Sequence, residues 1–146
     1  MNSEKPLDTL VGGYSNTAIF RTIAFVGDSL SSGEFQTRKP DGSFGYHDLY
    51  EYSWGQYMAR TTGAKVYNFS RGGMTAVEYC RSFAASRDFW NPEYAAQAYI
   101  IAMGANEILF GRNKKYIGTT ADIDLENPDN NKDTLAGWYG KMIQKY

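Results

Sequence analysis

The chain has 146 residues, of which 15 are basic and 16 acidic, giving a net charge of −1. Hydrophobic residues make up 42% of it, enough for one folded domain with a core, which excludes a disordered chain. The balanced charge offers no basic field for nucleic acid or anionic lipid. No apolar run approaches the ~20 residues of a transmembrane helix, so we expect no membrane span.

The cellular compartment is only weakly indicated. The first ten residues, MNSEKPLDTL, lack the apolar segment of a signal peptide, which slightly favours the cytoplasm. A secreted protein whose signal had been removed would look the same. The single cysteine, Cys80, excludes a disulfide within the chain, and its place on the apolar side of a helical pattern predicts a buried small hydrophobe.

The first predicted element is a buried strand over residues 19–26, an apolar run bounded by Gly27 and Asp28. Residues 36–50, QTRKPDGSFGYHDLY, are polar and rich in turn signals, so they predict a long loop. Residues 52–60 predict a helix that begins after Ser53 as N-cap and ends at Gly63.

The second half of the chain predicts two more strands and three more helices. The strands are AKVYNF at 64–69 and YIIAM at 99–103, both largely apolar runs. Apolar residues at helical spacing predict helices at 74–83 and 135–146, and Pro92 begins a short helix at 92–98.

A second long loop is predicted between the last strand and the last helix. Residues 111–133 are polar and broken by glycine and proline, which is typical of a loop. Asp133 stands where the N-cap of the final helix is expected.

The alternation of strands and helices predicts an α/β fold with a parallel sheet covered by helices. Ligands of such sheets bind beyond the carboxyl ends of the strands. Three segments follow the predicted strands, and each holds small or polar residues: 27–29, 70–73 and 104–107. We therefore expect a functional site where these three segments meet.

The residues at the strand ends are suited to acyl transfer. Ser29 is a candidate nucleophile, which needs an adjacent general base. The N–H of Gly73 and the side-chain amide of Asn106 are candidate donors to a developing oxyanion. Each residue also has a purely structural explanation, since Gly27 and Gly73 can serve turns and Asn106 can cap a helix. Their occurrence at three successive strand ends favours a shared site.

The three segments resemble the motif blocks of the SGNH, or GDSL, hydrolase family of esterases and lipases. VGDSLS at 26–31 resembles the first block, NFSRGGMT at 68–75 the second and MGANE at 103–107 the third. The resemblance implies a three-layer αβα, flavodoxin-like fold without a metal or organic cofactor. It makes Ser29 the nucleophile, with its own N–H, Gly73 and Asn106 as the oxyanion hole.

The resemblance also implies supporting roles. Gly27 and Asp28 would set the turn that carries the nucleophile. Glu107 stands where the family usually has aspartate, at a position that tends to orient neighbouring loops.

The chain departs from the family pattern because it lacks the C-terminal Asp-x-x-His block that supplies the base. Its one histidine, His47, is weighed as a replacement base, but a substrate contact from the predicted loop is preferred. We therefore expect residues 1–146 to be the N-terminal portion of a single SGNH domain. A complementary C-terminal segment or second chain would then be its partner.

The predicted function is hydrolysis of carboxylic esters through an acyl-serine intermediate, with this piece alone poorly active or inactive. The aromatic region 35–57 favours a small acyl group on a carbohydrate over a long lipid chain. One alternative is a non-catalytic SGNH-like carbohydrate-binding protein that lacks the base. Another is a flavodoxin-like phosphate or nucleotide binder, which Asp28 in the turn and the lack of a phosphate-binding glycine motif disfavour.

Overall fold

A computed structural model describes residues 16–109 and 117–146 of the chain. The segment MNSEKPLDTL and the first part of the predicted loop at 111–133 lie outside the described residues. The chain forms two compact units. The first unit runs to Gly72 and includes Ala96–Ala102, and the second unit comprises Gly73–Ala95 and Met103–Tyr146. None of the described helices is long and apolar enough to cross a membrane.

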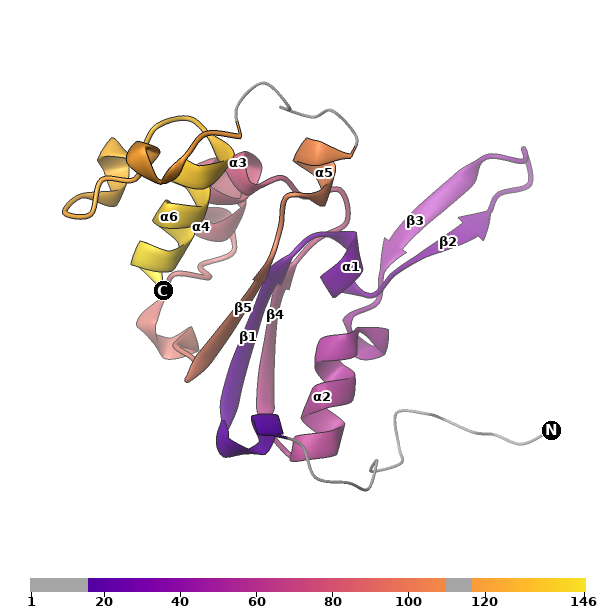
Figure 1. Ribbon diagram of the computed structural model, residues 1–146. Coiled ribbons are helices and arrows are strands. Elements are labelled where there is room, and N and C mark those ends of the chain that lie inside the picture. Colours follow the sequence, from indigo (N-terminus) through magenta and orange to yellow (C-terminus); the bar gives the residue numbers. More distant parts are fainter. Residues whose placement is uncertain (1–15, 110–116) are drawn as a thin grey trace. The chain divides into compact units, whose positions relative to one another are not determined.

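The first unit is built on a three-stranded parallel sheet (Figure 1). Its strands are β1 (Thr22–Gly27), β4 (Lys65–Ser70) and β5 (Ala98–Ala102), in the order β4-β1-β5. The second and third strands of this sheet along the chain thus flank the first, as in flavodoxin-like folds. The predicted α/β class with a parallel sheet is confirmed, although residues 16–19 form a 3₁₀ turn and not the start of the first strand.

One face of this sheet is covered by helix α2 (Trp54–Thr62). Phe25 of β1 is completely buried and meets the ring of Trp54 edge-on, with ring centroids 4.5 Å apart. A Cβ at Gly55 would come within 2.8 Å of the Phe25 ring, so this helix can approach the sheet only with a glycine there. Ser53 caps α2 and Gly63 ends it with φ of 72°, as the sequence predicts.

Residues 34–48 form an antiparallel hairpin, so the long loop predicted at 36–50 is wrong. Strands β2 (Glu34–Arg38) and β3 (Phe44–Asp48) pair in register and extend away from α1, the short helix Ser29–Ser32 (Figure 1). The Pro-Asp-Gly signal forms only the tip, where the Asp41 carboxylate accepts a hydrogen bond from the Ser43 N–H at 2.9 Å. Cross-strand pairing on either side of this tip turns the rest of the segment into strands.

The second unit contains a continuous helical run from Ala76 to Ser86. It consists of α3 (Ala76–Glu78), a π-helical turn at Tyr79–Phe83 and α4 (Ala84–Ser86), and it confirms the helix predicted at 74–83. Cys80 in this run is buried, as predicted, and burial raises the pKa of its thiol to about 12. The thiol is therefore a packing group that donates to the Trp138 carbonyl at 3.6 Å.

The final helix, α6 (Leu135–Lys145), is capped by Thr134 and not by Asp133 as predicted. The Thr134 hydroxyl accepts from the Gly137 N–H at 3.1 Å. Asp133 instead accepts from Arg81 at 2.7 Å and from the Trp138 indole N–H at 3.0 Å. The carboxylate that the local sequence pattern assigned to the N-cap therefore binds Arg81, 52 positions away.

Two further predictions need small corrections. The helix expected at 92–98 is a single 3₁₀ turn, Pro92–Tyr94, because Ala95 is already extended with ψ of 135° and leads into β5. The described part of the loop predicted at 111–133 contains two 3₁₀ turns, Thr120–Asp122 and Pro128–Asn130.

Candidate active site

Ser29 is the first residue of α1 and follows β1 after a single linking residue, Asp28. The Asp28 carboxylate accepts from the Leu30 N–H at 3.0 Å and thereby caps α1. A Cβ at Gly27 would lie 2.5 Å from the Ser31 hydroxyl and 3.0 Å from the Ala102 carbonyl oxygen, so the turn requires a glycine there. These contacts hold Ser29, which is half-buried, at the carboxyl end of the middle strand.

Two carboxyl groups close to this turn have raised pKa values. Burial raises the pKa of Asp28, whose residue is only 1% exposed. Burial, followed by the negative charges of Asp48 and Asp28, raises the pKa of Glu34. Burial thus penalises the ionised form of both carboxyl groups beside α1.

Two side chains that sequence analysis did not single out tie α1 to its neighbours in the first unit. Asp48, at the end of β3, accepts from the Ser32 hydroxyl at 2.5 Å and from the Gly72 N–H at 3.1 Å. Asn68 of β4 donates to the Ser31 carbonyl at 2.8 Å. Asn68 opens the second motif, so the motif itself was the signal for it, whereas Asp48 was hidden in the segment interpreted as a loop.

In the second unit, Asn106 is joined to the loop that contains Gly73. Gly73 has φ of 69°, a left-handed conformation that favours glycine. Asn106 is 7% exposed, and its side-chain N–H donates to the carbonyl of Met74, the residue after Gly73, at 2.8 Å. A carboxamide nitrogen carries two N–H donors, and Met74 takes one of them. The structure thus brings these two predicted site residues into one neighbourhood.

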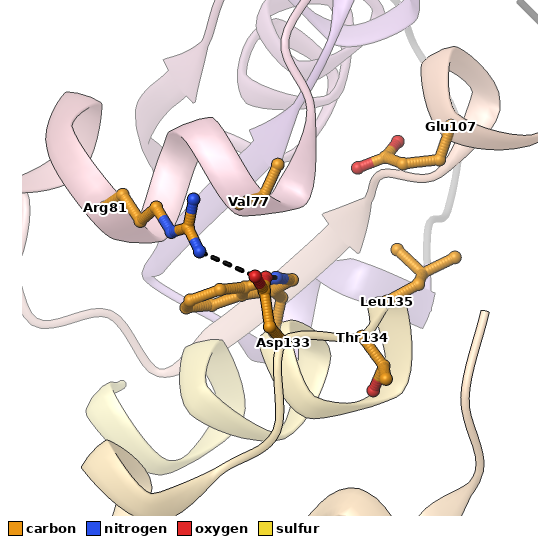
Figure 2. A pocket seen from close by; sticks show the side chains of 7 residues that line it. Val77, Arg81, Glu107, Asp133, Thr134 and Leu135 are labelled. Carbon is orange, nitrogen blue, oxygen red and sulfur yellow. Dashed lines mark hydrogen bonds and ion pairs between the residues drawn. The ribbon is translucent and has the colours of Figure 1, made fainter. Parts of the chain in front are cut away.

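Glu107 makes a second connection between the same two segments. It lies in α5 (Ala105–Ile108), is 4% exposed, and its carboxylate accepts from the Ala76 N–H at the start of α3. Figure 2 shows the Glu107 carboxylate directed toward the helix that carries Val77. A carboxylate at a helix N-terminus is electrostatically favourable, so Glu107 can hold the segment after Gly73 in place.

The same view shows a small pocket beside Glu107 (Figure 2). Its volume is about 120 Å³. It is lined by Val77, Arg81, Glu107, Asp133, Thr134, Leu135 and Trp138. Arg81 and Asp133 form an ion pair of 2.7 Å across it, and the Arg81 guanidinium lies 5.3 Å from the centre of the Trp138 ring. Arg81 and Asp133 are thus engaged with each other, and Glu107 accepts from the Ala76 N–H, which indicates a structural role for these charged groups.

Comparison with known proteins identifies the family. The GDSL-like lipase/acylhydrolase family matches residues 23–136, a range that spans the three motifs. The chain belongs to this family. No curated protein and no solved structure matches the sequence. The match confirms the predicted SGNH/GDSL family and the α/β fold, and it supports a hydrolase of ester type in general, without a substrate.

The histidine of this GDSL-like hydrolase is engaged within the hairpin. The Nε2 atom of His47 on β3 lies 2.9 Å from the Thr37 hydroxyl on β2, and its ring stacks on Phe35 with centroids 5.3 Å apart. Among residues 16–109 and 117–146, no group of three or more His, Cys, Asp or Glu side chains is placed to hold a metal ion. Of the predicted site residues, Gly27, Asp28, Ser29 and His47 thus belong to the first unit, and Gly73, Asn106 and Glu107 to the second.

Proposed function

We propose that this protein cleaves carboxylic esters through an acyl-serine intermediate formed on Ser29. The Ser29 hydroxyl attacks the ester carbonyl carbon while a histidine takes its proton. The negative oxygen of the tetrahedral intermediate accepts hydrogen bonds from the N–H groups of Ser29 and Gly73 and from the Asn106 amide. The C–O bond then breaks, and the histidine returns the proton to the departing alcohol. Water repeats the sequence and releases the acid.

The observation that carries this proposal is the hydrogen bond from Asn106 to the Met74 carbonyl in the second unit. It couples two donors that the family uses together, although 32 residues separate the bonded positions. The register of the sheet supports their association with Ser29, because Gly27 of β1 lies opposite both Ser70 of β4 and Ala102 of β5. All three strands therefore end at the same level.

The short connections after the strands add to this support. Gly73 follows the end of β4 by three residues and Asn106 follows the end of β5 by four. An extended chain spans about 3.5 Å per residue, which limits each donor to within about 14 Å of its strand end.

We further propose that the base and the carboxylate that orients it come from a segment outside residues 1–146. The sequence has no Asp-x-x-His block, and the hydrogen-bonding partner described for His47 is Thr37 of the same hairpin. Among the described strands, β5 is an edge of the sheet, and its five apolar residues are only half-buried. An apolar edge of this kind is suited to pairing with further chain. Residues 1–146 are then one portion of a single SGNH domain.

The proposed substrate is a small acyl group on a ring-bearing alcohol such as a carbohydrate. Exposed aromatic side chains of the region 35–57, including Phe35 and Tyr52, support a ring over a long lipid chain. A carbohydrate-binding protein without catalysis is the second candidate, and the lack of a described base favours it.

The decisive experiment compares Ser29→Ala with the unmodified protein in hydrolysis of p-nitrophenyl acetate. It uses both the 146-residue chain and the natural protein with any segments that flank it. In the natural protein, Ser29→Ala should lower the activity by a factor of about 10³ or more. The unmodified natural protein should carry an acetyl group on Ser29, which intact-mass measurement after rapid quenching would detect. Equal rates would reject Ser29 as nucleophile. Absence of turnover in all forms would favour the binding protein.

His47→Gln tests the proposed source of the base. Unchanged activity in the natural protein is expected if another segment supplies the histidine. A loss of activity comparable to that of Ser29→Ala would show that His47 is the base.

A further inference from the structure

The base of the hairpin and the end of α1 border an open hollow of about 450 Å³ in the first unit. It is lined by Gly33, Glu34, Phe35, Leu49 and Tyr52. We propose that this hollow, which we call the hairpin pocket, binds an uncharged aryl group of the ester substrate. The proposal rests on the assignment of Ser29 as nucleophile, and it narrows the ring-bearing alcohol proposed above to an aryl alcohol in place of a carbohydrate.

The hairpin pocket begins one helical turn from Ser29. Gly33 is the C-cap of α1, with φ of 73°, and Ser29 is the first residue of the same helix. Four residues at a rise of 1.5 Å correspond to about 6 Å along the helix, comparable to the length of a benzyl or benzoyl group. A Cβ at Gly33 would lie 2.3 Å from the Leu49 carbonyl oxygen, so the wall of the pocket contacts the end of α1 directly.

Hydrogen bonds fix this wall before any ligand arrives. Asp48 holds the end of β3 to Ser32 and Gly72, at 2.5 and 3.1 Å. The Tyr50 hydroxyl, just beyond β3, donates to the Ser70 carbonyl at 3.2 Å. A preformed wall lowers the ordering cost of binding, because few side chains lose freedom when the ligand enters.

The lining of the hairpin pocket is apolar and exposed. Phe35 is 45% exposed, Leu49 37% and Tyr52 60%. A ligand that covers these side chains removes their apolar surface from water, which favours binding. The stacking of His47 on Phe35 holds the Phe35 ring at a defined angle. Flat aromatic ligands can stack on such rings or meet them edge-on, whereas the hydroxyl groups of a sugar would find few polar partners.

Charge sets the second requirement, that the ligand is not an anion. Glu34 is the only charged side chain among the lining residues. The pKa of Glu34 is raised by burial and then by the neighbouring charges of Asp48 and Asp28, so the surroundings of the pocket are already negative. An anionic ring would add to this repulsion, while a neutral ring avoids it.

Fluorine NMR on the full chain tests the hairpin pocket with three probes: 4-fluorobenzyl alcohol, 4-fluorobenzoate and methyl 6-deoxy-6-fluoroglucoside. We expect the neutral alcohol to show protein-dependent line broadening, and the benzoate to bind at least about threefold more weakly. Phe35→Ala and Leu49→Ala should each weaken binding of the alcohol about fivefold. Binding of the fluorosugar alone would overturn the aryl assignment.

Phe44→Ala is the matched control, because Phe44 is 51% exposed on the same hairpin but does not line the pocket. It should leave binding unchanged, and an equal loss in Phe44→Ala and Phe35→Ala would overturn the pocket. Glu34→Gln should reduce the discrimination against 4-fluorobenzoate, and unaltered discrimination would contradict the charge argument.

Ser29→Ala separates this inference from the proposed function. It should keep probe binding while it loses hydrolysis of p-nitrophenyl acetate. Lost hydrolysis in Ser29→Ala with unchanged probe binding in Phe35→Ala and Leu49→Ala would reject the pocket alone. Probe binding that depends on Phe35, with equal hydrolysis in Ser29→Ala, would reject Ser29 as nucleophile and with it the link to the reaction.

Discussion

Two regions of the molecule, the surroundings of α1 in the first unit and the loop at 117–134 in the second, shift the pKa values of their acidic side chains in opposite directions. In the first unit, burial raises the pKa of Asp28 and Glu34, which lie next to α1. In the loop of the second unit, hydrogen bonds lower the pKa of Asp122, Asp124 and Asp129. Asp124, for example, accepts from the backbone N–H groups of Glu126 and Asn127, both at 2.9 Å.

This difference sets the region of the proposed nucleophile apart from a loop that its ionised carboxylates stabilise. A raised carboxyl pKa means that ionisation opposes folding, a cost that proteins accept mainly where a site needs the group. A lowered pKa means that the ionised carboxylate stabilises the fold. The surroundings of α1 should therefore contribute less stability as the pH rises through the raised pKa values of Asp28 and Glu34. The loop of the second unit should lose stability as the pH falls through the lowered ones.

The largest effect expected in the second unit comes from removing the Asn106 side chain, one of its two proposed oxyanion donors. Asn106→Ala should lower kcat for ester hydrolysis by a factor of about 100 with a smaller change in KM, because the oxyanion exists only after attack. The measurement is steady-state hydrolysis of p-nitrophenyl acetate by the natural protein.

The matched control for Asn106→Ala is Asn130→Ala, which removes a side-chain amide that donates to Asp124 at 3.0 Å in the loop. Its kcat should stay unchanged. A uniform loss of kcat in both variants, or an unchanged kcat in Asn106→Ala, would show that the second unit supplies no oxyanion donor through this residue.

Removing the carboxylate of Glu107 should affect stability and activity together. Glu107→Ala leaves the buried Ala76 N–H without its acceptor, so the free energy of unfolding should fall by about 1–3 kcal/mol in urea titrations. Glu107→Gln keeps an acceptor oxygen, so its free energy of unfolding should lie between those of Glu107→Ala and the unmodified protein. Glu126→Ala, at an exposed position, is the control and should change little. A Glu107→Ala protein of full stability would show that this contact does not hold the segment after Gly73.

The parts of the fold that sequence predicted depend on local patterns. The apolar runs gave all three parallel strands to within a few residues, and Ser53 and Gly63 marked the ends of α2 because caps are local features. The hairpin was missed because its polar strands carry few apolar residues, and its base depends on Asp48 binding Gly72, 24 positions away. Asp133 and Thr134 are both suitable N-caps, and the contacts of Asp133 with Arg81 and Trp138 decide between them.

Only those residues of the candidate site that belong to the three motifs could be predicted from the sequence. Ser29, Gly73 and Asn106 were named from three short segments, and the structure adds how two of them are held, through the Met74 carbonyl. No sequence pattern marks Asp48 or the lining of the hairpin pocket, because those residues meet only through the turn at Gly33 and the pairing of β2 with β3.

A smaller effect, visible as a change with pH, is expected from Asp28→Asn. Asparagine caps helices as well as aspartate does, so α1 should keep its cap while a buried charge is removed. Because the folded pKa of Asp28 is raised above its ordinary value of 3.8, the variant should be more stable than the unmodified protein at neutral pH. This advantage should shrink as the pH falls and vanish below that value. Urea titrations across the range measure it, and a variant that is less stable at neutral pH would contradict it.

The smallest effect is expected from Asp124→Asn in the loop of the second unit. Asparagine keeps one acceptor oxygen for the N–H groups of Glu126 and Asn127. In place of the second oxygen, which now accepts a hydrogen bond from the Asn130 amide, it has an NH₂ group that can only donate. Because the folded pKa of Asp124 is lowered, the variant should melt below the unmodified protein at neutral pH, and the gap should close as the pH falls through the lowered pKa. In one buffer series, Asp28→Asn and Asp124→Asn should therefore shift the melting temperature in opposite directions at neutral pH and converge in acid. Shifts of the same sign would mean that the surroundings of α1 and the loop at 117–134 do not differ in how they shift the pKa values of their carboxyl groups.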